Sequence, residues 1–172
     1  MTEKITEEGK RIKELYRSLI GRSEALDRQF KNLFEKAEGE YNPAPDILTG
    51  DYGMRFANLF DTAGDLLSDV ELVRKDLHDK IDYFISSLWL EEKMKLEKRI
   101  AEGEKVKVTD KLLDKTVTNN QGIYELRLLY NQLEALASHV LRKRETIWEI
   151  INLLKKTADI KTQFAQSLGE LK

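Results

Sequence analysis

The sequence predicts an all-α fold, an elongated bundle of long, coiled-coil-like helices in a protomer that self-associates. Apolar residues recur at steps of three and four over most of the chain, which is the period of an amphipathic helix. The two prolines, Pro43 and Pro45, lie within one pentapeptide, so the rest of the chain can form uninterrupted helices. Charged residues make up 35% of the chain and the mean hydropathy is −0.53, which indicates a thin core with much wet helix surface.

The first helix is predicted over residues 5–37, and Gly21 inside it suggests a close helix crossing or a soft spot. A connector follows over residues 39–53, because Pro43 and Pro45 favour extended backbone and glycines stand at both ends. We therefore divide the chain into residues 1–50, the first helix with its connector, and residues 51–172, the longer helices with a short one between them. The two parts are expected to form one continuous domain.

An apolar stripe from Phe56 to Leu88 predicts a second helix over residues 55–101. At about 1.5 Å per residue such a helix would be roughly 70 Å long. A fold-back near Gly64 or at Ser86 and Ser87 is the alternative to one continuous helix.

A short linker separates this helix from the last one. Residues 103–108 alternate polar and apolar side chains, which predicts a short strand. Thr109 is a favourable N-cap and Asp110 suits the positive end of a helix, so a small helix is predicted over residues 111–117. Residues 118–122 are rich in asparagine and glycine and predict a turn.

The last helix is predicted to begin near Ile123 and to fray after Asp159. Its heptad-like seam predicts an interface for self-association, and Lys143 interrupts that seam where a leucine is expected. Trp148 is interpreted as a core residue. The seam consists of Leu126, Leu129, Leu133, Leu136, Val140, Ile147, Ile150 and Leu154.

Neither catalysis nor a metal or cofactor site is predicted. The chain has no P-loop, GxGxxG motif or nucleophile elbow. His78 and His139 lie in different predicted helices without ligand-spaced partners, which favours surface or inter-helix histidines over metal ligands. Cysteine is absent, no segment resembles a signal peptide, and no apolar run reaches the ~20 residues that span a bilayer. We expect a cytoplasmic protein without membrane contact.

Two basic clusters are the candidate binding residues, although the net charge of −2 excludes a globally basic protein. In one interpretation, the first cluster is a lysine-rich helix end and the second is a polar break that fixes the register of the seam. Alternatively, both line a surface that follows a nucleic-acid backbone, with Trp89, Tyr83 and Phe84 as stacking faces. The first cluster is Lys93, Lys95, Lys98, Arg99, Lys105 and Lys107, and the second is Arg142, Lys143 and Arg144.

The order of these elements resembles the phage recombination mediators of the UvsY type. The matching segments are residues 91–99, 107–117 and 133–151, in the second half of the chain. The resemblance implies a homo-oligomeric helical ring that binds single-stranded DNA and helps to load a RecA-like recombinase in an infected host cell. The DNA contacts that it implies are Lys93, Lys95, Lys98 and Arg99.

The sequence therefore predicts a non-enzymatic, single-stranded DNA-binding recombination mediator. In that interpretation the linker is a hinge that sends the last helix to a neighbouring subunit. The alternative is a helical structural or adaptor protein, such as a virion or assembly component, that binds protein partners through its apolar seams. A mediator should lose affinity as salt rises, whereas an apolar interface should resist salt.

Overall fold

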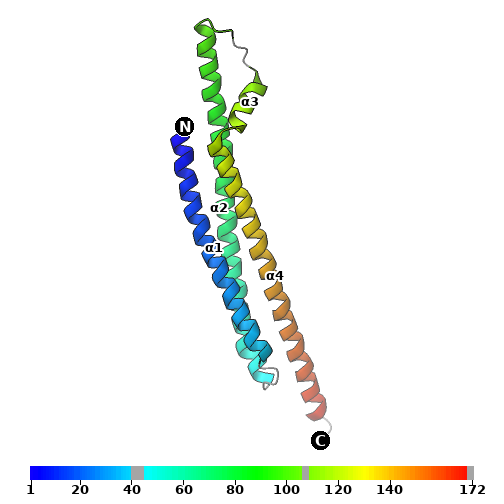
Figure 1. The fold of residues 1–172 in the computed structure, drawn as a ribbon. Coiled ribbons are helices and arrows are strands. Elements are labelled where there is room, and N and C mark those ends of the chain that lie inside the picture. The colour runs from blue at the N-terminus through cyan, green and yellow to red at the C-terminus, as the bar shows by residue number, and fades with distance from the viewer. Residues whose placement is uncertain (40–44, 106–108, 170–172) are drawn as a thin grey trace. The chain divides into compact units, whose positions relative to one another are not determined.

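The computed structural model describes residues 1–39, 45–105 and 109–169. These residues contain no strand, which confirms the all-α fold class. They form α1 (Thr2–Gly39), α2 (Pro45–Ala101), α3 (Asp110–Thr118) and α4 (Gln121–Gly169) (Figure 1).

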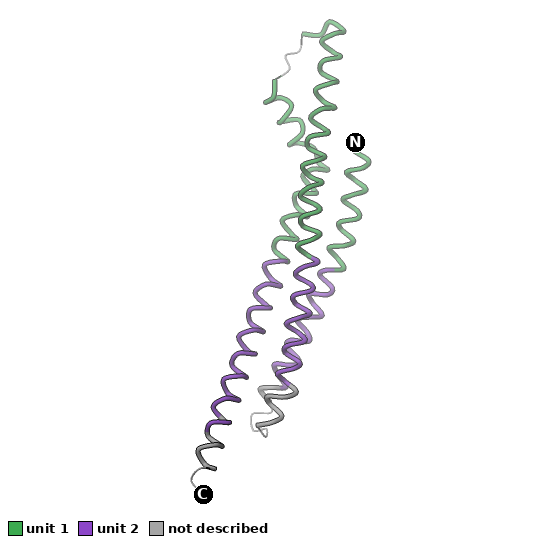
Figure 2. The backbone as a smooth tube through the Cα atoms, turned by 180° about the vertical axis from the view of Figure 1, so that it is seen from behind, with its two compact units in different colours: residues 1–18, 70–136 green, residues 19–69, 137–172 purple. Residues whose placement is uncertain are grey.

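The chain forms two compact units, each built from segments that are far apart in the sequence (Figure 2). Unit 1 comprises Met1–Ser18 and Val70–Leu136, and unit 2 comprises Leu19–Asp69 and Ala137–Lys172. The boundaries fall inside α1, α2 and α4, so each unit takes a segment from each of these helices. Within each unit the α2 segment runs antiparallel to the segments of α1 and α4 (Figure 1).

The core of unit 1 joins one apolar stripe from each of its helices. Full burial of one such side chain typically contributes about 1.5–3 kcal/mol to folding. The stripes recur at three- and four-residue steps, as the helical period requires. Their buried members include Ile5 and Ile12 of α1, Leu77, Ile81, Phe84 and Leu88 of α2, Leu113 and Val117 of α3, and Ile123, Leu126, Leu129 and Leu133 of α4.

The core of unit 2 follows the same rule and adds an aromatic cluster. The ring of Phe30 meets that of Phe56 edge-on, with centroids 6.4 Å apart, and stacks on that of Phe34 at 5.9 Å. Buried aliphatic side chains form the rest of this core. They include Leu19, Leu26 and Leu33 of α1, Leu59 and Leu66 of α2, and Val140, Ile147 and Ile151 of α4.

The short helix α3 confirms the prediction from its cap. The Thr109 hydroxyl accepts a hydrogen bond from the backbone N–H of Leu112 at 3.3 Å, and Asp110 stands in the first turn. Leu113 and Val117 are buried, so one face of α3 belongs to the core of unit 1. Both ends of the helix and its apolar face were readable in the sequence.

The strand predicted over residues 103–108 is wrong in its described part. Gly103 has a φ of 94°, and its N–H donates to the carbonyl of Ile100 at 3.0 Å. The N–H of Glu104 donates to the carbonyl of Arg99 at 3.0 Å. These bonds close the end of α2 around a left-handed glycine, so these groups are not free to pair as a strand. Residues 106–108, and with them Lys107, lie outside the described residues.

Helix α2 begins earlier than the sequence suggested, and it is continuous. The predicted connector is wrong from Pro45 onward, because α2 begins at Pro45. Proline is tolerated at the first helical position, since the backbone N–H that it lacks has no partner within the first turn of a helix. Residue 50 therefore lies within α2. The helix continues through Gly64 and through Ser86 and Ser87 without a break. Pro43 and the side chains of Ile47 and Leu48 lie outside the described residues.

One of the two alternatives predicted for Gly21, the close crossing, is wrong, and so is the predicted fraying of the last helix. Gly21 marks no close crossing, because a Cβ built on it would meet no atom within 4 Å. Helix α4 begins at Gln121, and its backbone stays helical to Gly169 rather than fraying after Asp159.

The apolar seam of α4 is a core within the chain rather than an interface between copies. α1 and α2 of the same chain cover most of its side chains, since each unit contains all three helices. The hinge hypothesis is wrong for the same reason, because the start of α4 packs in unit 1, with Gly122 against Ile5. Leu126, Leu129, Leu133, Leu136, Val140 and Ile147 are buried, and Ile150 and Leu154 are half-buried.

Four charged side chains link α1 to α2 in unit 1. Glu8 accepts hydrogen bonds from Arg11 Nε and Lys80 Nζ, both at 2.8 Å. Asp76 accepts a hydrogen bond from Arg11 Nη2 at 2.6 Å. Burial alone would raise the pKa of both carboxyls, but the hydrogen bonds from Arg11 and Lys80 lower the pKa of Glu8 and of Asp76.

Acid is expected to weaken this network. A carboxyl with a lowered pKa in the folded state contributes stability above its unfolded pKa and loses it as pH falls through the folded value. The free energy of unfolding should therefore decrease once the pH falls below the ordinary pKa values of these groups, which are 4.5 for Glu8 and 3.8 for Asp76. Urea unfolding between about pH 7 and pH 3 should show a shallower fall for Glu8→Gln than for the wild type. The exposed Glu14→Gln is the control, and equal slopes for all three proteins would contradict the prediction.

Candidate functional site

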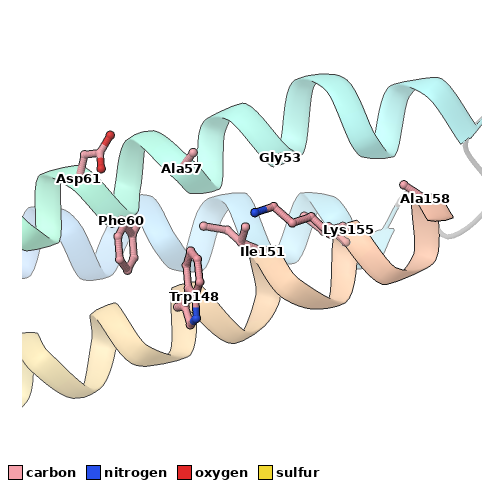
Figure 3. A pocket seen from close by; sticks show the side chains of 9 residues that line it. Gly53, Ala57, Phe60, Asp61, Trp148, Ile151, Lys155 and Ala158 are labelled. Carbon is pink, nitrogen blue, oxygen red and sulfur yellow. The ribbon is translucent and has the colours of Figure 1, made fainter.

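An apolar groove runs between α2 and α4 in unit 2 (Figure 3). Its volume is about 330 Å³. Helical spacing gathers its lining residues on one face of each helix, over about two turns of α2 and about three turns of α4. The α2 wall is Gly53, Ala57, Phe60 and Asp61, and the α4 wall is Trp148, Ile151, Leu154, Lys155 and Ala158.

Small and large residues together create the groove. Gly53 has no side chain and Ala57 has only a methyl group, so at these positions α2 fills little of the space opposite α4. Phe60 then closes one end, with its ring centroid 5.4 Å from that of Trp148. Figure 3 shows these two rings facing each other across the groove.

Trp148 is the most unusual side chain of the groove, and its interpretation as a core residue is wrong. Its side chain is 46% exposed, because the neighbouring Ile147 takes the core position. Lys155 Nζ lies 5.4 Å from the ring centroid of Trp148, and the guanidinium of Arg144 lies 4.1 Å from that of Phe60. These cation–π contacts hold two aromatic faces at the groove.

The two walls of the groove carry one charged lining residue each, and these have opposite sign. They are Asp61 on the α2 wall and Lys155 on the α4 wall.

The first basic cluster is neutralised by adjacent carboxylates. Residues 91–105 contain five acidic and five basic side chains, so the segment has no formal net charge. The hydrogen bonds that Lys95 and Arg99 donate to Glu92 and Glu104, respectively, raise the pKa of Lys95 and of Arg99. A segment without net charge attracts a phosphate backbone only weakly. The pairs are Lys95–Glu92 at 2.6 Å, Arg99–Glu104 at 2.6 Å and Lys98–Glu102 at 3.9 Å.

The remaining residues near this cluster are divided between surface and core. Lys93 Nζ lies 5.3 Å from the ring centroid of Trp89, which is half-buried, and Lys105 is exposed. Tyr83 is exposed, whereas Phe84 is buried and is not available as a stacking face.

The second basic cluster braces unit 2. Lys143 Nζ lies 3.0 Å from Asp27 Oδ1 and 4.7 Å from the ring centroid of Phe30. Arg144 covers Phe60, as described above, and Arg142 Nε donates to the carbonyl of Ser138 at 3.3 Å. Lys143 therefore occupies a seam position from which its side chain pairs with Asp27 of α1.

The two histidines lie in different helices, and each lies near a carboxylate. His139 Nε2 lies 3.0 Å from Asp27 Oδ2, between α4 and α1, and His78 is exposed beside Asp82. Burial alone would raise the pKa of Asp27, but hydrogen bonds from Lys143 and His139 lower it. In the described part of the chain, no group of three or more histidines and carboxylates could hold a metal ion. Nor does any helix there have the length and hydropathy to cross a bilayer.

Sequence reasoning missed the groove because its two walls come from distant segments. Gly53 was assigned to the end of the connector, Ala57 is an ordinary helix residue, and Trp148 lies next to the seam. The available signal was Trp148 itself, a large aromatic residue directly after the core residue Ile147 in a helix with an otherwise regular seam.

Comparisons of the chain with protein-family models, with curated proteins and with solved structures found no match. The resemblance to UvsY-type mediators therefore stays a prediction.

Proposed function

We propose that the protein is a non-enzymatic helical assembly component whose copies associate through the apolar groove of unit 2. The observation that carries this proposal is the half-exposed Trp148 in a groove lined by Phe60, Ile151 and Leu154. Tryptophan is enriched at the energetic centre of protein interfaces, where its removal commonly costs about 2 kcal/mol or more.

The opposite charges of Asp61 and Lys155 favour a second copy of this chain as the binding partner. A two-fold axis parallel to the groove would set the acidic α2 wall of one copy against the basic α4 wall of the other. The α2 wall with Asp61 would then face the α4 wall with Lys155 of the other copy, and the two Trp148 rings would lie between the walls. Both partners of each pair are present on one face, as a self-complementary interface requires.

Self-association is expected to depend on Trp148. Sedimentation at about micromolar protein should show a mass that rises with concentration for the wild type and a monomer for Trp148→Ser. Leu153→Ser is the matched control, because Leu153 lies on the same helix, is 63% exposed and does not line the groove. Circular dichroism checks that both variants stay helical. A wild type that stays monomeric, or equal association of Trp148→Ser and the wild type, would refute the proposal.

Charge reversal at Asp61 and at Lys155 tests how the two copies are arranged. Asp61→Lys and Lys155→Glu should each weaken association, because each sets like charges against one another across the two-fold axis. The double variant should restore association, since it reverses both members of each pair. Failure of the double variant to recover would overturn this arrangement of the two copies.

A single-stranded DNA-binding mediator that assists a RecA-like recombinase is the second candidate. It is supported by the order of α2, the Thr109-capped α3 and α4, in the part of the chain that carries the resemblance. The ion pairs of residues 91–105 count against the predicted contacts, because they leave this segment without net charge to attract a phosphate backbone. Fluorescence anisotropy with a labelled single-stranded oligonucleotide at low salt tests them, because the triple variant Lys93→Ala, Lys98→Ala and Arg99→Ala should bind more weakly than the wild type if they contact DNA, and equal binding would contradict the assignment.

A further inference from the structure

Arg144 is a cation of unit 2 that has no carboxylate partner in the described part of the chain. Its Nε is buried, and no hydrogen-bond acceptor among the described residues reaches it. Its contacts are the ring of Phe60, whose centroid lies 4.1 Å from Cζ, and the bare backbone at Gly64. A buried donor without an acceptor costs free energy, so the placement of this side chain needs a physical reason.

Gly64 allows the guanidinium to lie against α2. A Cβ at Gly64 would already touch Nε at 3.4 Å, so a longer side chain there would compete with the guanidinium for the same space. Phe60 and Gly64 thus hold Arg144 at the closed end of the apolar groove, half-buried and partly open to solvent. A cation that is already held in place loses little conformational entropy when a carboxylate binds it.

The register of α2 and α4 places a carboxylate at the level of Arg144. Phe60 is level with Trp148 and Gly64 with Arg144, so four residues forward on α2 match four residues back on α4. Asp65 follows Gly64, lies about 1.5 Å further along the helix, and is exposed. Within the described part of one chain Asp65 forms no ion pair, since consecutive helix residues point about 100° apart and Gly64 is the one that faces Arg144.

We propose that Arg144 of one copy forms an ion pair with Asp65 of the second copy when the copies associate through the apolar groove. A two-fold axis parallel to the groove turns the second copy without shifting it along the helices. Asp65 of each copy therefore lies at the level of Arg144 of the other copy. This inference rests on the proposed function, and it names the residue pair that sets how the two copies align.

Two ion pairs then border the aromatic centre of the interface. Asp61 and Asp65 are four residues apart, so they share one face of α2. Lys155 and Arg144 each cover one of the two facing aromatic rings of the groove, so α4 presents one cation for each carboxylate. Charges across an interface fix its register and its partner more than they add affinity, and Asp65 with Arg144 is expected to act in this way.

Complementation between two variants tests the pair. Arg144→Glu and Asp65→Arg each set like charges together at both equivalent sites of a dimer. Each variant alone should therefore associate about tenfold or more weakly than the wild type. An equal mixture of the two should regain the wild-type affinity, because each site of the mixed dimer then joins one acidic and one basic side chain. Sedimentation measures association, and circular dichroism checks that the variants stay helical.

Arg142→Glu is the matched control for Arg144→Glu. Arg142 lies on the same helix, is exposed, and does not line the groove. A mixture of Arg142→Glu with Asp65→Arg should not recover full association. If Arg144→Glu loses helicity, Arg144→Gln combined with Asp65→Arg in one chain replaces it. That double variant should associate more tightly than Asp65→Arg alone, because it removes the repulsion.

The outcomes separate this inference from the proposed function. A wild type that stays monomeric, or that associates equally well as Trp148→Ser, overturns both. If the wild type associates through Trp148 but Asp65→Arg associates equally well, only the ion pair is overturned, and the same holds if the mixture does not recover. Recovery in the mixture supports both, because a second chain cannot restore a contact that lies within one chain.

Discussion

Replacement of Phe56 with alanine is expected to lower the free energy of unfolding by about 3–5 kcal/mol. The side chain is 1% exposed and packs against the ring of Phe30 in the core of unit 2. Alanine would remove this edge-on contact and leave a cavity that the surrounding helices can fill only in part. Urea unfolding followed by circular dichroism measures the loss.

Phe34→Ala is the matched control for Phe56→Ala. Phe34 contacts the same ring of Phe30, but it is 38% exposed, so its loss exposes little new apolar surface. The expected cost is about 0.5–1.5 kcal/mol, the usual value of one aromatic pair. Equal losses for the two variants would mean that Phe56 is not part of a closed core.

Gly122→Ala is expected to destabilise the protein by about 1–3 kcal/mol, although alanine is the better helix former. A Cβ on Gly122 would lie 2.6 Å from Cγ2 of Ile5. That methyl group is on a buried, β-branched side chain of α1, which has little freedom to move away. Overpacking should therefore outweigh the gain in helix propensity, as chemical denaturation would show.

Gly21→Ala should have the opposite sign. Its Cβ would meet no atom within 4 Å, so only helix propensity acts, and it should stabilise the protein by up to about 1 kcal/mol. In the Ile5→Ala background, Gly122→Ala should lose its penalty, because the blocking methyl group is gone. A penalty that persists in that background would show that the contact with Ile5 is not the cause.

Local signals explain which elements could be predicted. Thr109, Asp110 and the apolar pair Leu113 and Val117 specify α3 within nine residues, because capping and helical spacing act between near neighbours. Pro45 was misread for a related reason. Proline ends one helix and begins another equally well, and the sequence around it does not say which applies.

The candidate site could be predicted only in part. The pairing of Lys95 with Glu92 and of Lys98 with Glu102 follows from steps of three and four, so the neutrality of the first cluster was readable in the sequence. The placement of Arg144 over Phe60 and of Lys143 on Asp27 joins helices that are distant in the chain. No local pattern contains that information.

The sequence by itself determined that the chain is helical, where α3 starts, and which stripe of each long helix is apolar. These properties follow from the period of the helix and from caps, which involve residues within one or two turns. The tertiary structure alone decided what covers each stripe. The seam of α4 suits a second copy as well as it suits α1 and α2, because apolar burial has no direction. Packing within each unit assigned the seam to the chain itself and left Trp148 beside a groove.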